Sequence, residues 1–153
     1  MSRSNALEFH LGDIDGQHER LFELQRSARL SLQNETDPAR IRTELGGLRM
    51  YAKLHFDVEE SFFSESGYPD AEVHRREHQV FLGQMDALIE DCGGDGQTVC
   101  ARFDAAGVWL QRHILEQDMQ YVEFLRLTGD HRDRLQAFGS HEEGVTKASA
   151  RTP

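Results

Sequence analysis

Residues 41–62 read IRTELGGLRMYAKLHFDVEESF, and the spacing of their apolar residues decides the fold. The positions expected to face a core follow one another at alternating steps of four and three residues: Ile41, Leu45, Leu48, Ala52, His55, Glu59 and Phe62. This spacing places them on one face of an α-helix, as in helices that pack in bundles. The face is apolar except near its end, where His55 and Glu59 stand at core positions.

The same rhythm recurs in three other stretches, separated by breaks rich in Asn, Pro and Gly. We expect helices over about residues 15–33, 38–65, 70–91 and 97–127, with Pro38 in a first turn. The other three stretches supply these expected core positions: Ile14, His18, Leu21, Gln25, Ala28 and Leu32; His74, His78, Phe81, Met85 and Leu88; and Val99, Phe103, Ala106, Leu110 and His113.

Four helices joined by short loops predict an all-α protein, an up-down-up-down four-helix bundle over residues 14–128. Residues 1–13 are expected to form a short N-terminal arm. Residues 129–153 are expected to form a polar tail, in which helical signal is confined to about residues 130–138.

Composition restricts the function classes. The 153 residues suffice for one domain, and a net charge of −10 argues against nucleic acid and anionic lipid as partners. No apolar run approaches the roughly 20 residues of a membrane span, and the N-terminus lacks a secretory signal, so a cytoplasmic protein is expected. Cys92 and Cys100 fit no redox or haem motif and are expected to be reduced thiols, with a loop-closing disulfide as the alternative.

Ionisable residues on the expected core faces point to a metal. His18, His55, Glu59, His74 and His78 all lie on these faces, where an unpaired ionisable group is costly to bury. A single such histidine is most often an ordinary core residue with one hydrogen-bond partner. Five such residues on three helices are better explained by one shared metal site, because residues four apart project from one helix face.

The fourth helix contains an irregular step. Its core rhythm reaches His113 and resumes at Asp118, five residues later, before Tyr121 and Leu125. A step of five rotates a side chain by about 140° on a regular helix. We therefore predict a one-residue π-bulge between His113 and Asp118, a feature common at functional sites. The alternative is an exposed Asp118 with Gln117 on the core face.

Five imidazoles and two carboxylates exceed the roughly four ligands of a single zinc ion and favour two divalent metals. The lack of cysteine in the set argues against structural zinc and iron–sulfur clusters, and the mixed nitrogen and oxygen donors suit iron.

Four motifs resemble those of the hemerythrin family, especially its bacterial members, over about residues 9–127. The motifs are Ile14-Asp15-Gly-Gln17-His18, His55-x-x-x-Glu59, His74-x-x-x-His78 and Trp109-Leu110-x-x-His113-Ile114-x-x-x-Asp118-x-x-Tyr121. The resemblance implies a protein that binds O2 reversibly, for carriage, storage or sensing, at a non-haem di-iron centre.

The resemblance also implies a role for each residue. His74, His78 and His113 would bind one iron, and His18 and His55 the other. Glu59 and Asp118 would bridge the two irons together with a solvent-derived oxo or hydroxo group. O2 would bind at the open position of the two-histidine iron, with Leu110 guarding the pocket, and Gln17 and Asp15 are candidates for orienting the ligands. The segment before Ile14 is shorter than is usual in the family.

Two other functions stay open: a di-iron oxidoreductase acting on peroxide or nitric oxide, and a bundle whose metal only stabilises the fold. No further acid–base or nucleophilic constellation accompanies the site, so a non-enzymatic role is expected. No motif indicates a protein partner.

Overall fold

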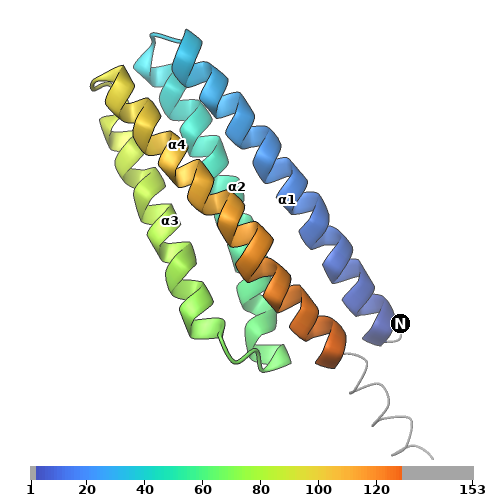
Figure 1. Ribbon diagram of the computed structural model, residues 1–153. Coiled ribbons are helices and arrows are strands. Elements are labelled where there is room, and N and C mark those ends of the chain that lie inside the picture. The colour runs from blue at the N-terminus through green and yellow to red at the C-terminus, as the bar shows by residue number, and fades with distance from the viewer. Residues whose placement is uncertain (1–2, 129–153) are drawn as a thin grey trace, which may run out of the picture.

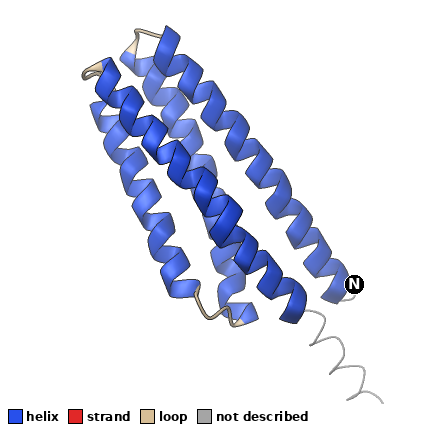
Figure 2. Ribbon diagram, viewed as in Figure 1, coloured by secondary structure: helices blue, strands red, loops and turns tan. Residues whose placement is uncertain are grey.

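The computed structural model describes the backbone of residues 3–128 and the side chains of residues 12–128. It is a four-helix bundle built from α1 (Arg3–Asn34), α2 (Pro38–Ser66), α3 (Ala71–Asp91) and α4 (Gly96–Arg112). The chain continues through η1 (His113–Asp118) into helical residues 119–128. Successive helices run antiparallel, and α1 also contacts α4, which closes the bundle (Figures 1 and 2). None of the described helices has the length and apolar character needed to span a membrane.

Local side chains explain where the helices start and stop. Asp37 caps the start of α2, directly before Pro38 in the first turn. Its side chain accepts a hydrogen bond of 2.9 Å from the backbone N–H of Ala39. Asp95 caps α4 in the same way through the N–H of Thr98, at 2.9 Å. Gly67 ends α2 with φ +68°, a left-handed conformation that suits glycine. These caps hold the short loops that make neighbouring helices antiparallel.

The first helix is longer than expected. The sequence predicts a start near residue 15, but α1 begins at Arg3, so that boundary is wrong. No proline interrupts residues 3–15, and Leu7 and Leu11 precede Ile14 at the same steps of three and four residues. The backbone of the expected arm therefore belongs to α1 from residue 3 onward. The division of the chain at residues 14 and 128 stays a prediction, and the helix expected near residues 130–138 lies outside the described residues.

The buried core consists of two apolar clusters. The larger cluster contains Leu21, Phe56, Phe81 and Leu110 and extends along the bundle toward the loops after α1 and α3. The smaller cluster consists of the buried residues Ile14, Phe63, Tyr68, Tyr121, Val122 and Leu125. On each helix the ionisable residues expected on the core face lie where the two clusters meet, whereas Gln25 of α1 is only partly buried, alongside the larger cluster.

On α2, the core position expected at Phe62 is occupied by Phe63. Phe63 is 1% exposed and belongs to the smaller cluster, whereas Phe62 is only partly buried against it. Steps of three and of four from Glu59 both stay on the core side of a helix, so the spacing alone does not separate the two phenylalanines.

Both cysteines are free, so the reduced thiols are confirmed and the alternative of a disulfide is wrong. The Cys92 thiol is buried and donates weakly to the backbone oxygen of Pro38, at 3.6 Å. It acts as a small apolar residue of the larger cluster.

Candidate metal centre

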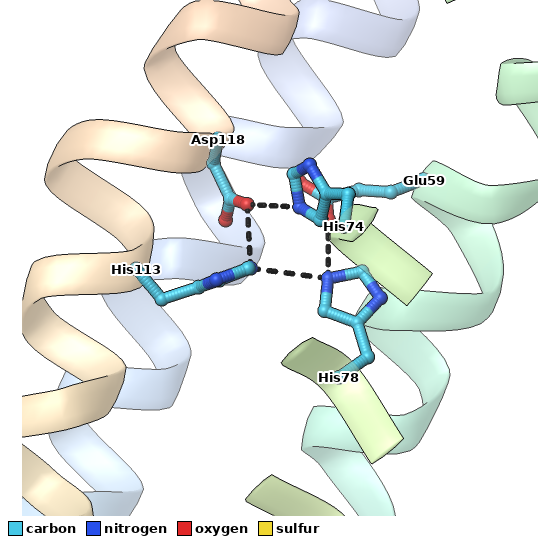
Figure 3. A group of neighbouring side chains, drawn as sticks. All are labelled: Glu59, His74, His78, His113 and Asp118. Atoms are coloured by element: carbon cyan, nitrogen blue, oxygen red, sulfur yellow. Dashed lines mark hydrogen bonds and ion pairs between the residues drawn. The ribbon is translucent and has the colours of Figure 1, made fainter. Parts of the chain in front are cut away.

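Seven ionisable side chains meet between the two apolar clusters. They are the seven residues selected from the sequence, each at most 7% exposed: His18, His55, Glu59, His74, His78, His113 and Asp118. Their ligand atoms form two compact groups. One group holds three histidines, the other holds two, and both include Glu59 and Asp118. Figure 3 shows the three-histidine group, with ligands from three helices directed at one another.

Asp118 is the centre of the cluster. Its Oδ1 atom lies 2.9 Å from Nε2 of His74 and 3.0 Å from Nε2 of His113. Its Oδ2 atom lies 3.0 Å from Nε2 of His18 and 3.3 Å from Nε2 of His55. The two oxygens therefore face different groups, one the three-histidine group and the other the two-histidine group.

Glu59 divides its oxygens in the same manner. Its Oε2 atom lies 3.2 Å from Nε2 of His78 and 3.4 Å from Nε2 of His74. Its Oε1 atom lies 3.4 Å from Nε2 of His55. Each carboxylate thus has one oxygen toward each group, the arrangement that bridging of two cations needs.

The π-helical turn η1 brings Asp118 into this position. On a regular helix a residue five positions after His113 would point elsewhere, but the wider turn places both residues at the cluster. Asp118 is fully buried, while Gln117 is only partly buried. The predicted π-bulge is confirmed, and the alternative of an exposed Asp118 is wrong.

Three of the histidines form a hydrogen bond through Nδ1 with a residue outside the seven-residue cluster. The Nδ1 of His55 lies 2.9 Å from Oε1 of Gln17, in agreement with the orienting role expected for that glutamine. The other two face carboxylates: His78 lies 2.8 Å from Oε1 of Glu60 and His113 lies 2.9 Å from Oε2 of Glu77. Because these oxygens accept hydrogen bonds, Nδ1 donates and Nε2 is left to face the cluster.

Aromatic rings fix the planes of two imidazoles. Phe56 stacks on His78 with ring centroids 3.8 Å apart and planes 8° from parallel. Trp109 stacks on His113 at 4.8 Å and 12°. Each ring is therefore restrained both by stacking and by a hydrogen bond at Nδ1, which limits rotation of the ligand nitrogen away from the cluster.

The pKa values of the two carboxylates are shifted in opposite directions. Burial, followed by repulsion from Asp118, raises the pKa of Glu59 well above its ordinary value. Burial also opposes ionisation of Asp118, but the contacts of its oxygens with the Nε2 atoms of His113, His18, His55 and His74 outweigh it and hold the pKa of Asp118 well below its usual range. In the metal-free protein Asp118 is thus the ionised member of the pair.

The pKa values of His78 and His74 are also shifted in opposite directions. Burial, followed by repulsion from His113, lowers the pKa of His78 to about 2. Burial also disfavours the charged form of His74, but the contacts with Asp118 and Glu59 raise its pKa to about 9. Without metal, His74 therefore carries a positive charge beside both carboxylates, whereas His78 is neutral.

The donor atoms fit metal cations. The Nε2 atoms of His78 and His113 lie 3.1 Å apart, and a glutamate oxygen accepts a hydrogen bond from Nδ1 of each ring. When both rings donate from Nδ1, both Nε2 lone pairs face the cluster, where a cation can bind them. Among the described residues, neither oxygen of Glu59 has a hydrogen-bond partner. Cations coordinated by these atoms would satisfy them together, so the cluster is able to bind metal.

Two site residues escaped the sequence analysis. Glu60 and Glu77 lie next to the expected ligands Glu59 and His78 in the sequence, which is the one signal that could have identified them. Asp15, a candidate for orienting ligands, is exposed, and no hydrogen bond among the described residues joins it to the cluster. Leu110 is fully buried in the larger apolar cluster, one turn before His113.

Comparison with known proteins agrees with this arrangement. The family model "Hemerythrin HHE cation binding domain" matches residues 11–125. A bacteriohemerythrin of Clostridium acetobutylicum is 30% identical over 123 residues, covering 76% of this chain and 95% of the relative. Bacteriohemerythrins of Stenotrophomonas maltophilia and Pseudomonas aeruginosa are 28% and 27% identical, over 72% and 74% of this chain and 71% and 73% of their own lengths. No solved structure matches the chain significantly. With a cation-binding family model covering most of its length and a buried cluster of metal-ligand type, the chain belongs to the hemerythrin family.

Proposed function

We propose that the protein binds O2 reversibly at a non-haem di-iron centre. The observation that supports this most directly is the pair of overlapping ligand groups that share Glu59 and Asp118. Under this proposal, one iron is held by His74, His78 and His113, and the other by His18 and His55. The two shared carboxylates would bridge the irons, together with a solvent-derived oxo or hydroxo group.

Because one group has three histidines and the other two, a di-iron centre held here would have an open coordination position for O2 on the two-histidine iron. With Glu59 and Asp118 common to both groups, the two-histidine group offers one protein ligand fewer, so an iron held there would have one protein ligand fewer. The position left open is suited to a small external ligand, as catalytic metal sites keep one position free. A site with a purely structural role would gain nothing from this asymmetry.

The donor set favours the reduced metal. Five neutral imidazoles and two carboxylates leave more positive charge on two divalent ions than a carboxylate-rich set would, and this stabilises the lower oxidation state. When bound, a ferrous pair supplies the electrons with which O2 is held reversibly.

The surrounding side chains would protect this chemistry. Leu110, Phe56 and Ile114 are each at most 3% exposed and belong to the apolar cluster that borders the site. These residues keep bulk water and its protons from the ligand atoms, conditions under which oxidation of the metal is slowed. The names of the relatives, bacteriohemerythrins, support the same function.

A spectroscopic experiment tests the proposal. The protein is loaded with ferrous iron under anaerobic conditions, air is admitted, and O2 is then removed while the visible spectrum is recorded. A visible absorption band that appears with O2 and disappears on its removal is expected. Irreversible oxidation with turnover of peroxide or nitric oxide would favour an oxidoreductase instead. A preparation that binds zinc and not iron would favour a structural metal.

A further inference from the structure

Two glutamates outside the ligand set contact the ligands of only one of the two metal groups. Oε1 of Glu60 on α2 accepts a hydrogen bond from Nδ1 of His78 on α3, at 2.8 Å. Oε2 of Glu77 on α3 accepts one from Nδ1 of His113, at 2.9 Å. Both bonds run from one helix to the next, so they tie the three-histidine group together across α2, α3 and η1.

The exposure of these side chains suits an outer anionic partner. The imidazoles are each 1% exposed, whereas the carboxyl side chains of Glu60 and Glu77 are 29% and 32% exposed. Each glutamate therefore keeps part of its hydration while its inner oxygen reaches a buried ring. A charge placed at this boundary avoids the full cost of burial and still acts on the imidazole through the hydrogen bond.

In the two-histidine group the acceptor at Nδ1 is of another kind. The Nδ1 of His55 faces the neutral amide oxygen of Gln17, at 2.9 Å. Within the three-histidine group, the Nδ1 of His74 is buried and has no hydrogen-bond partner among the described residues. Carboxylate acceptors thus occur on two ligands of one group, and an amide acceptor on a ligand of the other.

An anionic acceptor changes the donor strength of an imidazole. A carboxylate at Nδ1 polarises the N–H bond, fixes the tautomer with its lone pair at Nε2, and makes that nitrogen a stronger base. A stronger base stabilises the more highly charged metal. An amide oxygen fixes the same tautomer but contributes no charge.

We propose that Glu60 and Glu77 are positioning residues that fix His78 and His113 for metal binding and bias the three-histidine metal toward its higher oxidation state. The redox part of this inference rests on the proposed di-iron function. The affinity part does not, because it concerns any divalent metal held by these imidazoles.

Isosteric variants separate charge from geometry. Glu60→Gln and Glu77→Gln keep an acceptor oxygen and remove the charge, whereas Glu60→Ala and Glu77→Ala remove both. Co(II) affinity is measured by competition with a chelator, and the midpoint potential of the iron-loaded protein by redox titration followed in the visible spectrum. Thermal unfolding of each metal-free variant verifies the fold, and Glu90→Gln, an exposed glutamate on α3, is the control.

The Gln variants are expected to shift the midpoint potential to more positive values, and their effects should add in the double variant. The Ala variants are expected to weaken Co(II) binding by about tenfold or more. Gln17→Glu, which places a carboxylate on His55, should shift the midpoint potential in the opposite direction.

The outcomes distinguish this inference from the proposed function. Wild-type Co(II) affinity in the Ala variants, or effects equal to those of Glu90→Gln, would overturn the inference even if O2 binding is reversible. A wild-type protein that fails to bind O2 reversibly, while the Ala variants still lose Co(II) affinity, would remove the proposed function and leave the positioning role intact.

Discussion

Oδ1 of Asp118 lies 3.0 Å from Nε2 of His113, although the two residues are five positions apart on one continuous helical segment. A regular α-helix brings residues three or four apart onto one face, so the contact depends on the π-helical turn. The carboxylate that serves both metal groups is therefore placed by a local irregularity of the backbone.

Moving the carboxylate by one position tests this dependence. In the double variant Gln117→Asp/Asp118→Gln, we expect fewer than two metal ions per chain, because the turn directs residue 118 and not residue 117 at the cluster. Metal content is measured by elemental analysis after anaerobic loading with iron. Gln117→Asp alone should retain two ions, and retention of two ions by the double variant would contradict the role assigned to the turn.

Shared and unshared ligands should have different effects when removed. Glu59→Ala takes a carboxylate from both metal groups and is expected to abolish loading of the pair. His18→Ala removes a ligand of the two-histidine group only and is expected to leave one metal ion per chain. His74 also belongs to one group only, but it contacts both shared carboxylates, so His74→Ala should lose the pair. Native mass spectrometry counts the bound ions, with Glu90→Ala as the control. Equal losses in the Glu59 and His18 variants would argue against two overlapping sites.

Acid should destabilise the metal-free protein through His78. Its folded pKa of about 2 lies below the value of 6.5 for an unperturbed histidine. Between these values the unfolded chain binds a proton that the folded chain does not, so the free energy of unfolding falls as the pH falls, by at most about 1.4 kcal/mol per pH unit for one group. His74 does not offset this below pH 6.5, because with a folded pKa of about 9 it is protonated in both states.

Urea unfolding in the presence of a chelator, between pH 7 and pH 5, measures this slope. The non-titrating variant His78→Gln should show a shallower dependence on pH than the wild-type protein. Identical slopes for the two proteins would mean that His78 is not held neutral in the folded state.

Leu110 should protect reduced iron from oxidation. Leu110→Ala removes a fully buried side chain beside His113 and opens the apolar cluster to water, so the ferrous protein is expected to oxidise irreversibly faster in air. Leu45→Ala, at an equally buried position nearer the Pro38 end of α2, controls for loss of stability. Both changes should cost about 2–5 kcal/mol of unfolding free energy. If both accelerate oxidation equally, the protection comes from general stability and not from Leu110.

Most of the fold follows from the spacing of apolar residues. The steps of four and three predict four helices, and the observed starts of α2, α3 and α4 match the expected ones to within one residue. The step of five before Asp118 predicted the π-turn because the downstream core residues Tyr121 and Leu125 kept their face. The start of α1 differs from the expected one: the helix begins at Arg3, and the core spacing extends back from Ile14 through Leu11 and Leu7.

What the sequence determined by itself was the bundle and the seven residues that meet within it, because a buried ionisable residue at a core position is conspicuous in a one-dimensional pattern. What only the tertiary structure decided was the set of contacts around those residues. Glu60 and Glu77 occupy partly exposed positions that, in the sequence, resemble any solvated helix face. The packing of α2, α3 and η1 determines which of the many acidic residues reaches an imidazole, and Phe56 stacks on His78 for the same reason. Trp109, by contrast, stacks on His113 from the preceding turn of the same helical segment. Helix periodicity specifies the face on which a residue lies, but the relative placement of two helices specifies the atom that it touches.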